Sequence, residues 1–291
     1  MTEKSGIPPL AAAIHDLSCF GRCALTVILP TLSALGVQGV PLPTALLSSH
    51  TGGFDDLYFR DLTEDMEAIS AHFGRLGLSF DAIYSGFLGS AEQIGKVSAF
   101  IDGFRREGTL VLVDPVMGDD GSLYSTYTPE LMKGMKELCR RADVITPNYT
   151  EACFLTETPY LPTQNMSEEE VSSLCNGLLS ALGTFGAKYT VITGIACREE
   201  ILTVGTGADG EIFTHRTHRL SVGYPGTGDI FASVLLGLML RKRSFREAVD
   251  AAADFTSLTI RRTMPQKTPV RNGVTLESCM RELVALTDKT E

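Results

Sequence analysis

The stretch VGYPGTGDIFASVLLGLML, residues 222–240, sets a glycine-rich turn and an acidic residue directly before a charge-free apolar run. Aspartate is a poor residue for the interior of a helix and is seldom buried without a partner. The apolar run, residues 230–240, is too short to cross a membrane and has the length of a buried helix. We therefore predict a central buried helix, closely packed at Gly237, whose first turn carries Asp229.

The turn before this helix has the composition of an anion-binding site. Gly226 and Gly228 permit tight backbone geometry and close approach to a ligand. The free amides at the start of the helix favour negative charge, and Asp229 beside them is predicted to stay ionised. A carboxylate base next to such an anion hole suits the attack of an alcohol on a nucleotide phosphate. Taken alone, the same residues fit a capped helix start equally well.

The composition is that of an ordinary globular protein and argues against several classes of function. Of the 291 residues, 44% are hydrophobic and 21% are charged, which allows a large core. The net charge of −10 argues against general nucleic-acid binding, which needs a basic surface. A short basic run, residues 241–247, is explained as the solvated end of the apolar helix. We expect neither nucleic acid nor a membrane as a partner.

The cysteines and histidines show no pattern of a disulfide framework or a metal site. Seven cysteines are scattered along the chain, and the N-terminus MTEKSGIPPL has no apolar signal region. We therefore expect a reduced, cytoplasmic protein. Cys19 and Cys23 lack neighbouring ligands at zinc spacing, and His215 and His218 are predicted on opposite faces of one strand.

Short apolar runs alternate with helical stretches along the chain. The strands are predicted at residues 10–14, 37–42, 82–86, 109–114, 143–147 and 189–193, and the helices at residues 22–36, 61–76, 91–107, 129–141, 167–183, 228–242 and 245–262. This alternation predicts right-handed crossovers and a mostly parallel sheet with helices on both faces. Two late strands joined through Asp209 and Gly210 are predicted to form an antiparallel hairpin at one edge. No linker divides the chain, so we expect one domain, residues 1–291.

Polar side chains follow most of the predicted parallel strands. Open parallel sheets bind ligands beyond the carboxyl ends of their strands. The residues at these ends are His15, Asp16, Ser85, Gly86, Asp114, Thr146, Pro147, Asn148, Thr193 and Gly194. Acids and hydroxyls gathered at one edge are what a phosphate and metal site requires.

Two further segments carry polar turns. In DPVMGDDGSLY, residues 114–124, Asp119-Asp120-Gly121 is predicted to be a turn that suits Mg²⁺, which keeps waters and bridges substrate phosphates. In TPNYTEA, residues 146–152, Asn148 is predicted to cap a helix with Glu151 at its third position. Taken alone, the first segment also fits a solvated acidic turn, and the second a simple capping box.

Together these three clusters resemble the ribokinase superfamily, and within it the pyridoxal (vitamin B6) kinases. The superfamily pattern is GTGD at 226–229 and Asn-x-x-Glu at 148–151. The pyridoxal kinase pattern is SSHTGG at 48–53, SGFLGSAEQ at 85–93, DPVMGD at 114–119 followed by GSLY, ITPN at 145–148 and GTGDIFAS at 226–233. The similarity covers nearly the whole chain. It implies an α/β fold, the ribokinase-like three-layer αβα sandwich, with a mostly parallel central sheet and a few antiparallel edge strands.

The resemblance implies an ATP-dependent kinase that phosphorylates the 5′-hydroxymethyl group of pyridoxal, pyridoxine or pyridoxamine, with Mg²⁺ and a monovalent cation such as K⁺. Asp229 would be the base, and Gly226, Thr227 and Gly228 would form the anion hole. The implied ATP and metal residues are Asp119 and Glu151 for Mg²⁺, Asp114, Thr146 and Thr193 for phosphate and the monovalent cation, and Tyr124, Asn148, Thr227 and Gly228 for the nucleotide. The implied vitamin contacts are Asp16, His50, Thr51 and Phe87, with Asp229 at the reacting alcohol. The family often forms homodimers, so a homodimer is expected.

Two positions depart from the pyridoxal kinase pattern. Asp16 in IHDLSCFG stands where better-known members carry serine, and Phe87 replaces the tyrosine common in SGYLG. An acid at residue 16 can accept a hydrogen bond from the ring hydroxyl or favour a protonated amine, which would tilt preference toward pyridoxamine. Phe87 loses a hydroxyl but keeps the stacking face. Both changes bear on the choice of substrate rather than on the reaction.

Three other functions fit parts of the sequence. A hydroxymethylpyrimidine kinase of thiamine synthesis shares the fold and most phosphate motifs, although SSHTGG and DPVMGDDGSLY are closer to the vitamin B6 branch. A sugar or nucleoside kinase is disfavoured because the early Gly-Gly sugar motif is missing. A non-catalytic nucleotide- or vitamin-binding module is disfavoured by Asp229 with its flanking glycines intact.

Overall fold

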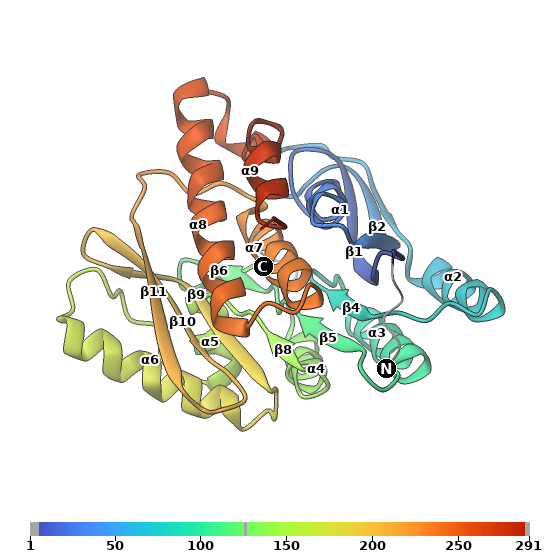
Figure 1. The fold of residues 1–291 in the computed structure, drawn as a ribbon, viewed down its shortest axis with the longest axis horizontal. Helices are drawn as coiled ribbons and strands as arrows, with labels where there is room; N and C mark the ends of the chain where they lie inside the picture. The colour runs from blue at the N-terminus through green and yellow to red at the C-terminus, as the bar shows by residue number, and fades with distance from the viewer. Residues whose placement is uncertain (1–5, 125–126, 289–291) are drawn as a thin grey trace.

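A nine-stranded sheet forms the middle layer of the protein (Figure 1). The computed structural model describes residues 6–124 and 127–288. The strands lie in the order β11-β10-β9-β8-β5-β4-β1-β2-β3, and the six from β9 to β2 run parallel, which confirms the predicted mostly parallel sheet. Their bounds are β1 (Leu10–Phe20), β2 (Gln38–Ser49), β3 (Phe59–Asp61), β4 (Ala82–Ser85), β5 (Leu110–Val113), β8 (Val144–Ile145), β9 (Tyr189–Cys197), β10 (Glu200–Thr206) and β11 (Ile212–His218).

Helices cover both faces of the sheet, as its buried parallel strands require. Figure 1 shows the two helical layers on opposite sides of the strands. One layer packs its apolar side chains into a shared core and consists of α1 (Leu25–Ala34), α7 (Thr227–Leu240), α8 (Phe245–Thr263) and α9 (Met280–Ala285). The other layer forms the second core and consists of α2 (Thr63–Arg75), α3 (Ala91–Phe104), α4 (Pro129–Cys139), α5 (Tyr149–Thr156) and α6 (Glu168–Gly183).

Helix α7 is buried along most of its length, as its apolar sequence predicts. Every residue from Ile230 to Leu238 is buried. A Cβ on Gly237 would lie 2.5 Å from Leu35 Cδ1, so glycine lets α7 approach the end of α1 closely. This packing fixes the start of the helix, and with it the glycine-rich turn, against the rest of the fold.

Three strands, β1, β2 and β9, run further than the sequence pattern predicted. β1 pairs with both β4 and β2 up to Ile14, and beyond a register shift at His15 it continues along β2 alone to Phe20. β9 likewise continues past the end of β8 and pairs with β10. The prediction that Asp16 and Thr193 follow strand ends was therefore wrong, because both lie inside longer strands. Each lies beyond the end of a shorter neighbouring strand, so both still belong to the carboxyl edge of the central sheet.

Antiparallel strands lie at both edges of the sheet. The predicted hairpin is confirmed, because β10 and β11 pair antiparallel around a turn in which Gly210 has φ +77°. At the opposite edge β3 pairs antiparallel with β2; its three residues are all exposed, so no apolar pattern predicted it. Also unpredicted are a small hairpin, β6 (Gly118–Asp119) and β7 (Ser122–Leu123), and three short 3-10 turns, η1 (Met264–Gln266), η2 (Val270–Asn272) and η3 (Leu276–Cys279).

Three smaller expectations have structural outcomes. Ser167 and Glu170 form the predicted capping box at the start of α6. The seven cysteine thiols are free, and Cys19 is the exposed one. Across residues 6–124 and 127–288, the structure contains no helix with both the length and the apolar character to span a bilayer.

Candidate active site

The first turn of α7 packs directly on the loop that precedes α1. Gly226 takes the N-cap position with φ +80°, a left-handed conformation that glycine adopts without strain. A Cβ here would lie 2.0 Å from the carbonyl oxygen of Arg22, so a side chain has no room. The amides of the first helical turn have no partner inside the helix and remain available to a ligand at this edge of the sheet.

Asp229 lies in this first turn, and a backbone amide holds its carboxylate. Its Oδ2 accepts a hydrogen bond of 2.8 Å from the N–H of Ala24, a residue with φ +48° just before α1. Asp229 keeps some exposed surface, although its carboxylate is closely surrounded by protein. Burial, helped by the charge of Asp16 and opposed by the Ala24 amide, raises the pKa of Asp229 to about 7. A carboxylate with a pKa near neutrality is suited to accept a proton in catalysis.

Asp114 follows β5 and faces the same turn. Its Oδ1 accepts a hydrogen bond of 3.1 Å from the Thr146 hydroxyl, and its Oδ2 lies 3.9 Å from where a Cβ on Gly228 would be. Burial and then the charge of Asp229 raise the pKa of Asp114 to about 8. The two carboxylates therefore compete for ionisation and titrate as a pair. Such a pair favours positive charge brought in by ligands or cations.

The ligand-free protein is expected to lose stability as the pH rises from about 4 toward 8. Asp114 and Asp229 have folded-state pKa values of about 8 and about 7, above the value of 3.8 for a free aspartate. Between these values the folded state keeps protons that the unfolded chain releases, so raising the pH favours unfolding. The measurement is the unfolding midpoint at about pH 6 and pH 8 for the wild type and Asp114→Asn. The midpoint of the wild type should fall more between pH 6 and pH 8 than that of Asp114→Asn. Equal decreases would contradict the raised pKa of Asp114.

Glu151 connects the start of α5 to the segment that follows β5. The predicted capping box is confirmed, because the Asn148 side chain accepts from the Glu151 N–H and Glu151 Oε2 accepts from the Asn148 N–H at 2.7 Å. The other oxygen, Oε1, accepts a hydrogen bond of 3.1 Å from the Met117 N–H. Burial and then the charge of Asp114 raise the pKa of Glu151 well above its ordinary value. Glu151 thus caps a helix and also lies within the electrostatic reach of the Asp114 carboxylate.

The β6–β7 hairpin lies beside Glu151 and carries the predicted acidic turn. Asp120 with φ +48° and Gly121 with φ +76° make this turn. Asn148 fixes the hairpin to α5, since its Nδ2 donates to the Gly118 carbonyl at 2.8 Å. Asp119 is exposed and accepts a hydrogen bond of 2.9 Å from the Asp120 N–H, so its carboxylate keeps the capacity to bind a ligand.

Three further predicted residues lie around this edge with fewer fixed contacts. Tyr124 directly follows β7 and is 43% exposed. Thr193 is half-buried and pairs with Asn148 in an isolated parallel bridge. The Thr227 hydroxyl donates to the Tyr224 carbonyl at 3.0 Å. The structure thus brings the residues predicted for nucleotide binding to one edge of the sheet, from the ends of several strands and the starts of α5 and α7.

The carboxylates at this edge fit a cation that binds mainly through phosphate and water. In the parts of the chain that the structure describes, no three His, Cys, Asp or Glu side chains converge on one metal position. Mg²⁺ needs no such cluster, because it is commonly held by one or two carboxylates, waters and nucleotide phosphates. Within the described parts of the chain, Asp114, Glu151 and Asp229 form no ion pair. A cation would compensate the negative charge of these carboxylates, whose pKa values are raised mainly by burial.

Asp16 extends the acidic surface from Asp229 toward β1 and β2. It is buried, and its Oδ2 accepts a hydrogen bond of 2.8 Å from the Ser18 hydroxyl. Burial raises the pKa of Asp16, while the Ser18 hydrogen bond and the nearby His50 lower it. Burial, followed by the charges of Asp229 and Asp16, raises the pKa of the Cys23 thiol, so both carboxylates lie within electrostatic reach of Cys23.

His50 is held in one tautomer at this end of the site. Its Nδ1 accepts a hydrogen bond of 3.1 Å from the Gly52 N–H, so the ring proton is on Nε2 and is donated to the Arg271 carbonyl at 2.6 Å. Thr51 is exposed and Phe87 is half-buried after β4. Thr51 directly follows His50, and its hydroxyl has no hydrogen-bond partner among the described residues; Phe87 lies two residues after β4, the strand that neighbours β1.

The C-terminal segment contributes to this end of the site, which the sequence did not predict. The guanidinium carbon of Arg271 lies 5.0 Å from the centre of the Phe54 ring, and its Nη1 donates to the Gly53 carbonyl at 3.1 Å. The Arg22 N–H donates to the Asn272 carbonyl at 3.2 Å. The bond between Arg271 and Gly53 joins positions 218 residues apart, so no local pattern could have revealed it.

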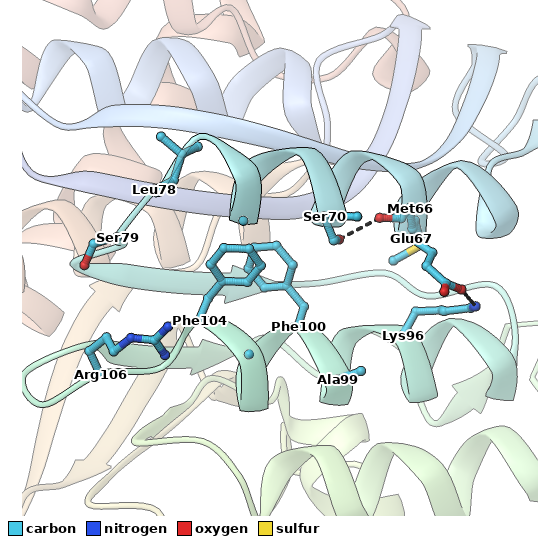
Figure 2. A pocket seen from close by; sticks show the side chains of 14 residues that line it. Met66, Glu67, Ser70, Leu78, Ser79, Lys96, Ala99, Phe100, Phe104 and Arg106 are labelled. Atoms are coloured by element: carbon cyan, nitrogen blue, oxygen red, sulfur yellow. Dashed lines mark hydrogen bonds and ion pairs between the residues drawn. The ribbon is translucent and has the colours of Figure 1, made fainter.

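A groove of about 710 Å³ lies away from these residues, between α2 and α3 (Figure 2). The rings of Phe100 and Phe104 line it, and at its rim Lys96 pairs with Glu67 at 2.5 Å. None of the predicted site residues lines this groove. The candidate active site is therefore the acidic edge of the sheet at the start of α7, and not this groove.

Comparison with known proteins finds relatives along most of the chain. Residues 19–273 match the family described as phosphomethylpyrimidine kinase. The pyridoxine/pyridoxal/pyridoxamine kinase of Bordetella avium is 29% identical over 272 residues, which cover 86% of this chain and 85% of that protein.

Two solved structures share the whole fold. A Bacteroides thetaiotaomicron protein described as a phosphomethylpyrimidine kinase, in a crystal form with pyridoxal, superposes with a TM-score of 0.87 at 38% identity and covers 95% of this chain and 96% of its own. The pyridoxal kinase of Lactobacillus plantarum superposes with a TM-score of 0.85 at 31% identity, covering 97% of this chain and 99% of its own. These likenesses confirm the ribokinase-like three-layer fold that the sequence motifs implied.

Proposed function

The chain belongs to the phosphomethylpyrimidine kinase family, and from this premise we propose that it transfers the γ-phosphoryl group of ATP to the 5′-hydroxymethyl group of pyridoxal, pyridoxine or pyridoxamine. The chain is a kinase, and its likeness to pyridoxal kinases supports the choice of these alcohols. The observation that carries the proposal is the Asp229 carboxylate, with a pKa of about 7, in the first turn of α7. A base and a set of free helix amides are thereby combined in one turn.

The proposed transfer runs in line from the alcohol to the nucleotide. Asp229 takes the proton of the substrate alcohol while the alcohol oxygen forms a bond to the γ-phosphorus. The bond between that phosphorus and the β,γ-bridging oxygen breaks, and ADP leaves with the electron pair. The amides from Gly226 to Gly228 would stabilise the charge on the moving phosphoryl oxygens. Positioning and charge stabilisation account for most of the catalysis in such a reaction.

The acidic edge of the sheet is proposed to hold the nucleotide phosphates and their cations. Mg²⁺, when bound, would neutralise phosphate charge, and Asp119 and Glu151 would hold it directly or through water. The proposed contacts to phosphate and a monovalent cation such as K⁺ are Asp114, Thr146 and Thr193, and those to the nucleotide are Tyr124, Asn148, Thr227 and Gly228. The raised pKa values of Asp114 and Glu151 support this assignment, because added positive charge would stabilise their ionised forms.

The vitamin ring is proposed to bind between Asp229 and the segment that carries His50. Asp16, His50, Thr51 and Phe87 would contact the ring and its substituents. Asp16 has a hydroxyl as its hydrogen-bond partner and forms no ion pair within the described residues, so a cationic substrate would supply the missing charge. This arrangement favours a vitamer with a protonated amine.

Replacing Asp16 by asparagine is expected to reduce the preference for pyridoxamine over pyridoxal by about tenfold in kcat/KM. A hydrogen bond to a charged partner is worth about 1.4 kcal/mol more than a neutral one, which corresponds to this factor. The measurement is the ratio of the two kcat/KM values, with Ser18→Ala as a control that removes only the neutral partner of Asp16. An unchanged ratio in Asp16→Asn would show that residue 16 does not distinguish the amine of pyridoxamine from the aldehyde of pyridoxal.

The second candidate substrate is hydroxymethylpyrimidine, which the family description and the Bacteroides thetaiotaomicron relative both favour. ADP formation measured with each of pyridoxal, pyridoxine, pyridoxamine and hydroxymethylpyrimidine separates the two functions. The proposal expects the highest kcat/KM with one of the three vitamers. A higher value with the pyrimidine would replace it, and no turnover with any of the four would favour a binding module.

A further inference from the structure

Three buried polar side chains lie on the core side of the Asp114–Asp229 pair without a hydrogen-bond partner. His15, Tyr84 and Ser233 are each fully buried. Within the described residues, neither ring nitrogen of His15 has a partner, and the hydroxyls of Tyr84 and Ser233 have none either. Buried polar atoms in native proteins are nearly always hydrogen-bonded, so three such groups in one place need a physical reason.

The strand pairing places Tyr84 and Asp114 on the same face of the sheet. Tyr84 on β4 is the partner of Leu112 on β5 and of Ala13 on β1. Asp114 still bonds the β4 backbone through its N–H, and it lies two residues after Leu112, so the two side chains share a face. His15 follows Ala13 by two residues, and its ring meets the Tyr84 ring edge-on with centres 4.3 Å apart.

Helix α7 covers this face and brings Asp229 and Ser233 to it. The two residues are four apart, so they lie one above the other on the same side of the helix. Burial, followed by the charges of Asp114 and Asp229, raises the pKa of Tyr84 well above its ordinary value, and its interaction with the neighbouring Ser233 hydroxyl lowers it. The phenol therefore keeps its proton, so it can donate a hydrogen bond on the face of the sheet that it shares with Asp114.

Each carboxylate keeps one oxygen for a further donor. Thr146 donates to Asp114 Oδ1 and the Ala24 amide donates to Asp229 Oδ2. No other donor bonds either carboxylate among residues 6–124 and 127–288. Asp114 Oδ2 and Asp229 Oδ1 are thus the acceptors left in the neighbourhood of the Tyr84 and Ser233 hydroxyls.

We propose that Tyr84, together with Ser233, is a positioning residue for phosphoryl transfer: its hydroxyl hydrogen-bonds the Asp114–Asp229 pair from the core side when the substrates are bound. The bond holds Asp229 toward the substrate alcohol without Tyr84 touching the substrate. His15 fixes the tyrosine ring, and it is itself held because a Cβ on Gly86 would lie 2.4 Å from its ring. This role rests on the proposed function, since it requires Asp229 to be the base.

The Tyr84→Phe variant removes only the hydroxyl and separates positioning from folding. We expect kcat to fall by about tenfold, the effect of one lost hydrogen bond to a charged group. The KM values for ATP and for the vitamer should stay within about twofold, because the hydroxyl does not touch either one. The unfolding midpoint should stay equal or rise, because the variant removes a buried hydroxyl that has no partner in the free protein.

Thr31→Val is the matched control, because Thr31 is another fully buried hydroxyl without a partner and lies in α1. It should keep the wild-type kcat with an equal or higher midpoint. Ser233→Ala should resemble Tyr84→Phe, and the double variant should be no slower than the slower single variant. Wild-type kcat in Tyr84→Phe would overturn the proposal, and so would losses that multiply in the double variant.

Asp229→Asn in the same assay tells apart the failure of this inference and the failure of the proposed function. If Asp229→Asn is inactive while Tyr84→Phe keeps the wild-type kcat, only the role of Tyr84 is overturned. If Asp229→Asn itself keeps turnover, the assignment of the base falls, and the role of Tyr84 falls with it.

Discussion

Replacing Asp229 by alanine is expected to lower kcat by about 10²–10⁴-fold, the usual contribution of a general base. The carboxylate lies in the first turn of α7 with a pKa of about 7, so it can take a proton near neutral pH. Affinity for ATP should change little, because the residues proposed for the nucleotide lie on other elements and on the backbone of the turn. Steady-state kinetics and an ATP-binding titration measure the two quantities separately.

Asp229→Asn is the control for the shape of the site. Its side-chain oxygen can still accept the hydrogen bond from the Ala24 N–H, so the start of α1 should stay in place. Both variants should fold with unfolding midpoints equal to or above that of the wild type near pH 8, because each removes a buried charge next to Asp114. Near-normal kcat in either variant would rule out Asp229 as the base.

Gly226→Ala is expected to lower kcat by more than about 10²-fold and to destabilise the protein. The left-handed conformation alone costs a non-glycine residue about 1–3 kcal/mol. The added Cβ would also lie 2.0 Å from the Arg22 carbonyl oxygen, so the turn must move away from residues 22–23. That movement displaces the amides of the anion hole and breaks the contact between Asp229 and Ala24, on which in-line geometry depends. Kinetics and thermal unfolding measure both effects.

Gly228→Ala is the matched control for this turn. Gly228 does not have a positive φ, and its added Cβ would meet Asp114 Oδ2 at 3.9 Å, an ordinary contact. It should unfold close to the wild-type midpoint and lose less activity than Gly226→Ala. If the two variants show equal losses of kcat and of unfolding midpoint, the close packing of Gly226 on Arg22 does not determine the position of the turn.

The local parts of the fold could be predicted from the sequence because short-range patterns determine them. The apolar residues from Ile230 to Leu238 predict a buried helix, and that helix is the centre of one layer. The capping boxes that begin at Asn148 and Ser167 depend on residues three positions apart, and the structure contains both. The parallel strands followed from their alternation with helices.

The remaining features depend on partners far away in the chain. β1 continues beyond Ile14 because β2 runs alongside it, and the sequence of residues 15–20 does not predict this extension. The segment around Arg271 reaches the site through contacts with Gly53 and with the loop at Arg22. His15 was predicted as a polar residue at the ligand edge, and this was wrong, because its ring is fully buried against Tyr84.

The chemistry of the site was also only partly visible in the sequence. The motifs indicated which acids belong together. The pKa values of Asp114, Glu151 and Asp229 are raised only in the folded protein, where their carboxylates are buried. Their raised pKa values follow from packing between β5, α5 and α7, which no spacing rule predicts. The physical consequence is a group of carboxylates whose charge a bound cation would stabilise.

The most direct measurement is a competition reaction with ATP and equal concentrations of pyridoxal and hydroxymethylpyrimidine, catalysed in parallel by the wild type and by Asp229→Asn. Mass spectrometry of the two phosphorylated products gives the ratio of their kcat/KM values directly. We predict that the wild type forms mainly pyridoxal 5′-phosphate and that Asp229→Asn forms almost none of either product. A predominance of the pyrimidine phosphate, or undiminished product from Asp229→Asn, would contradict a vitamin B6 kinase with Asp229 as its base.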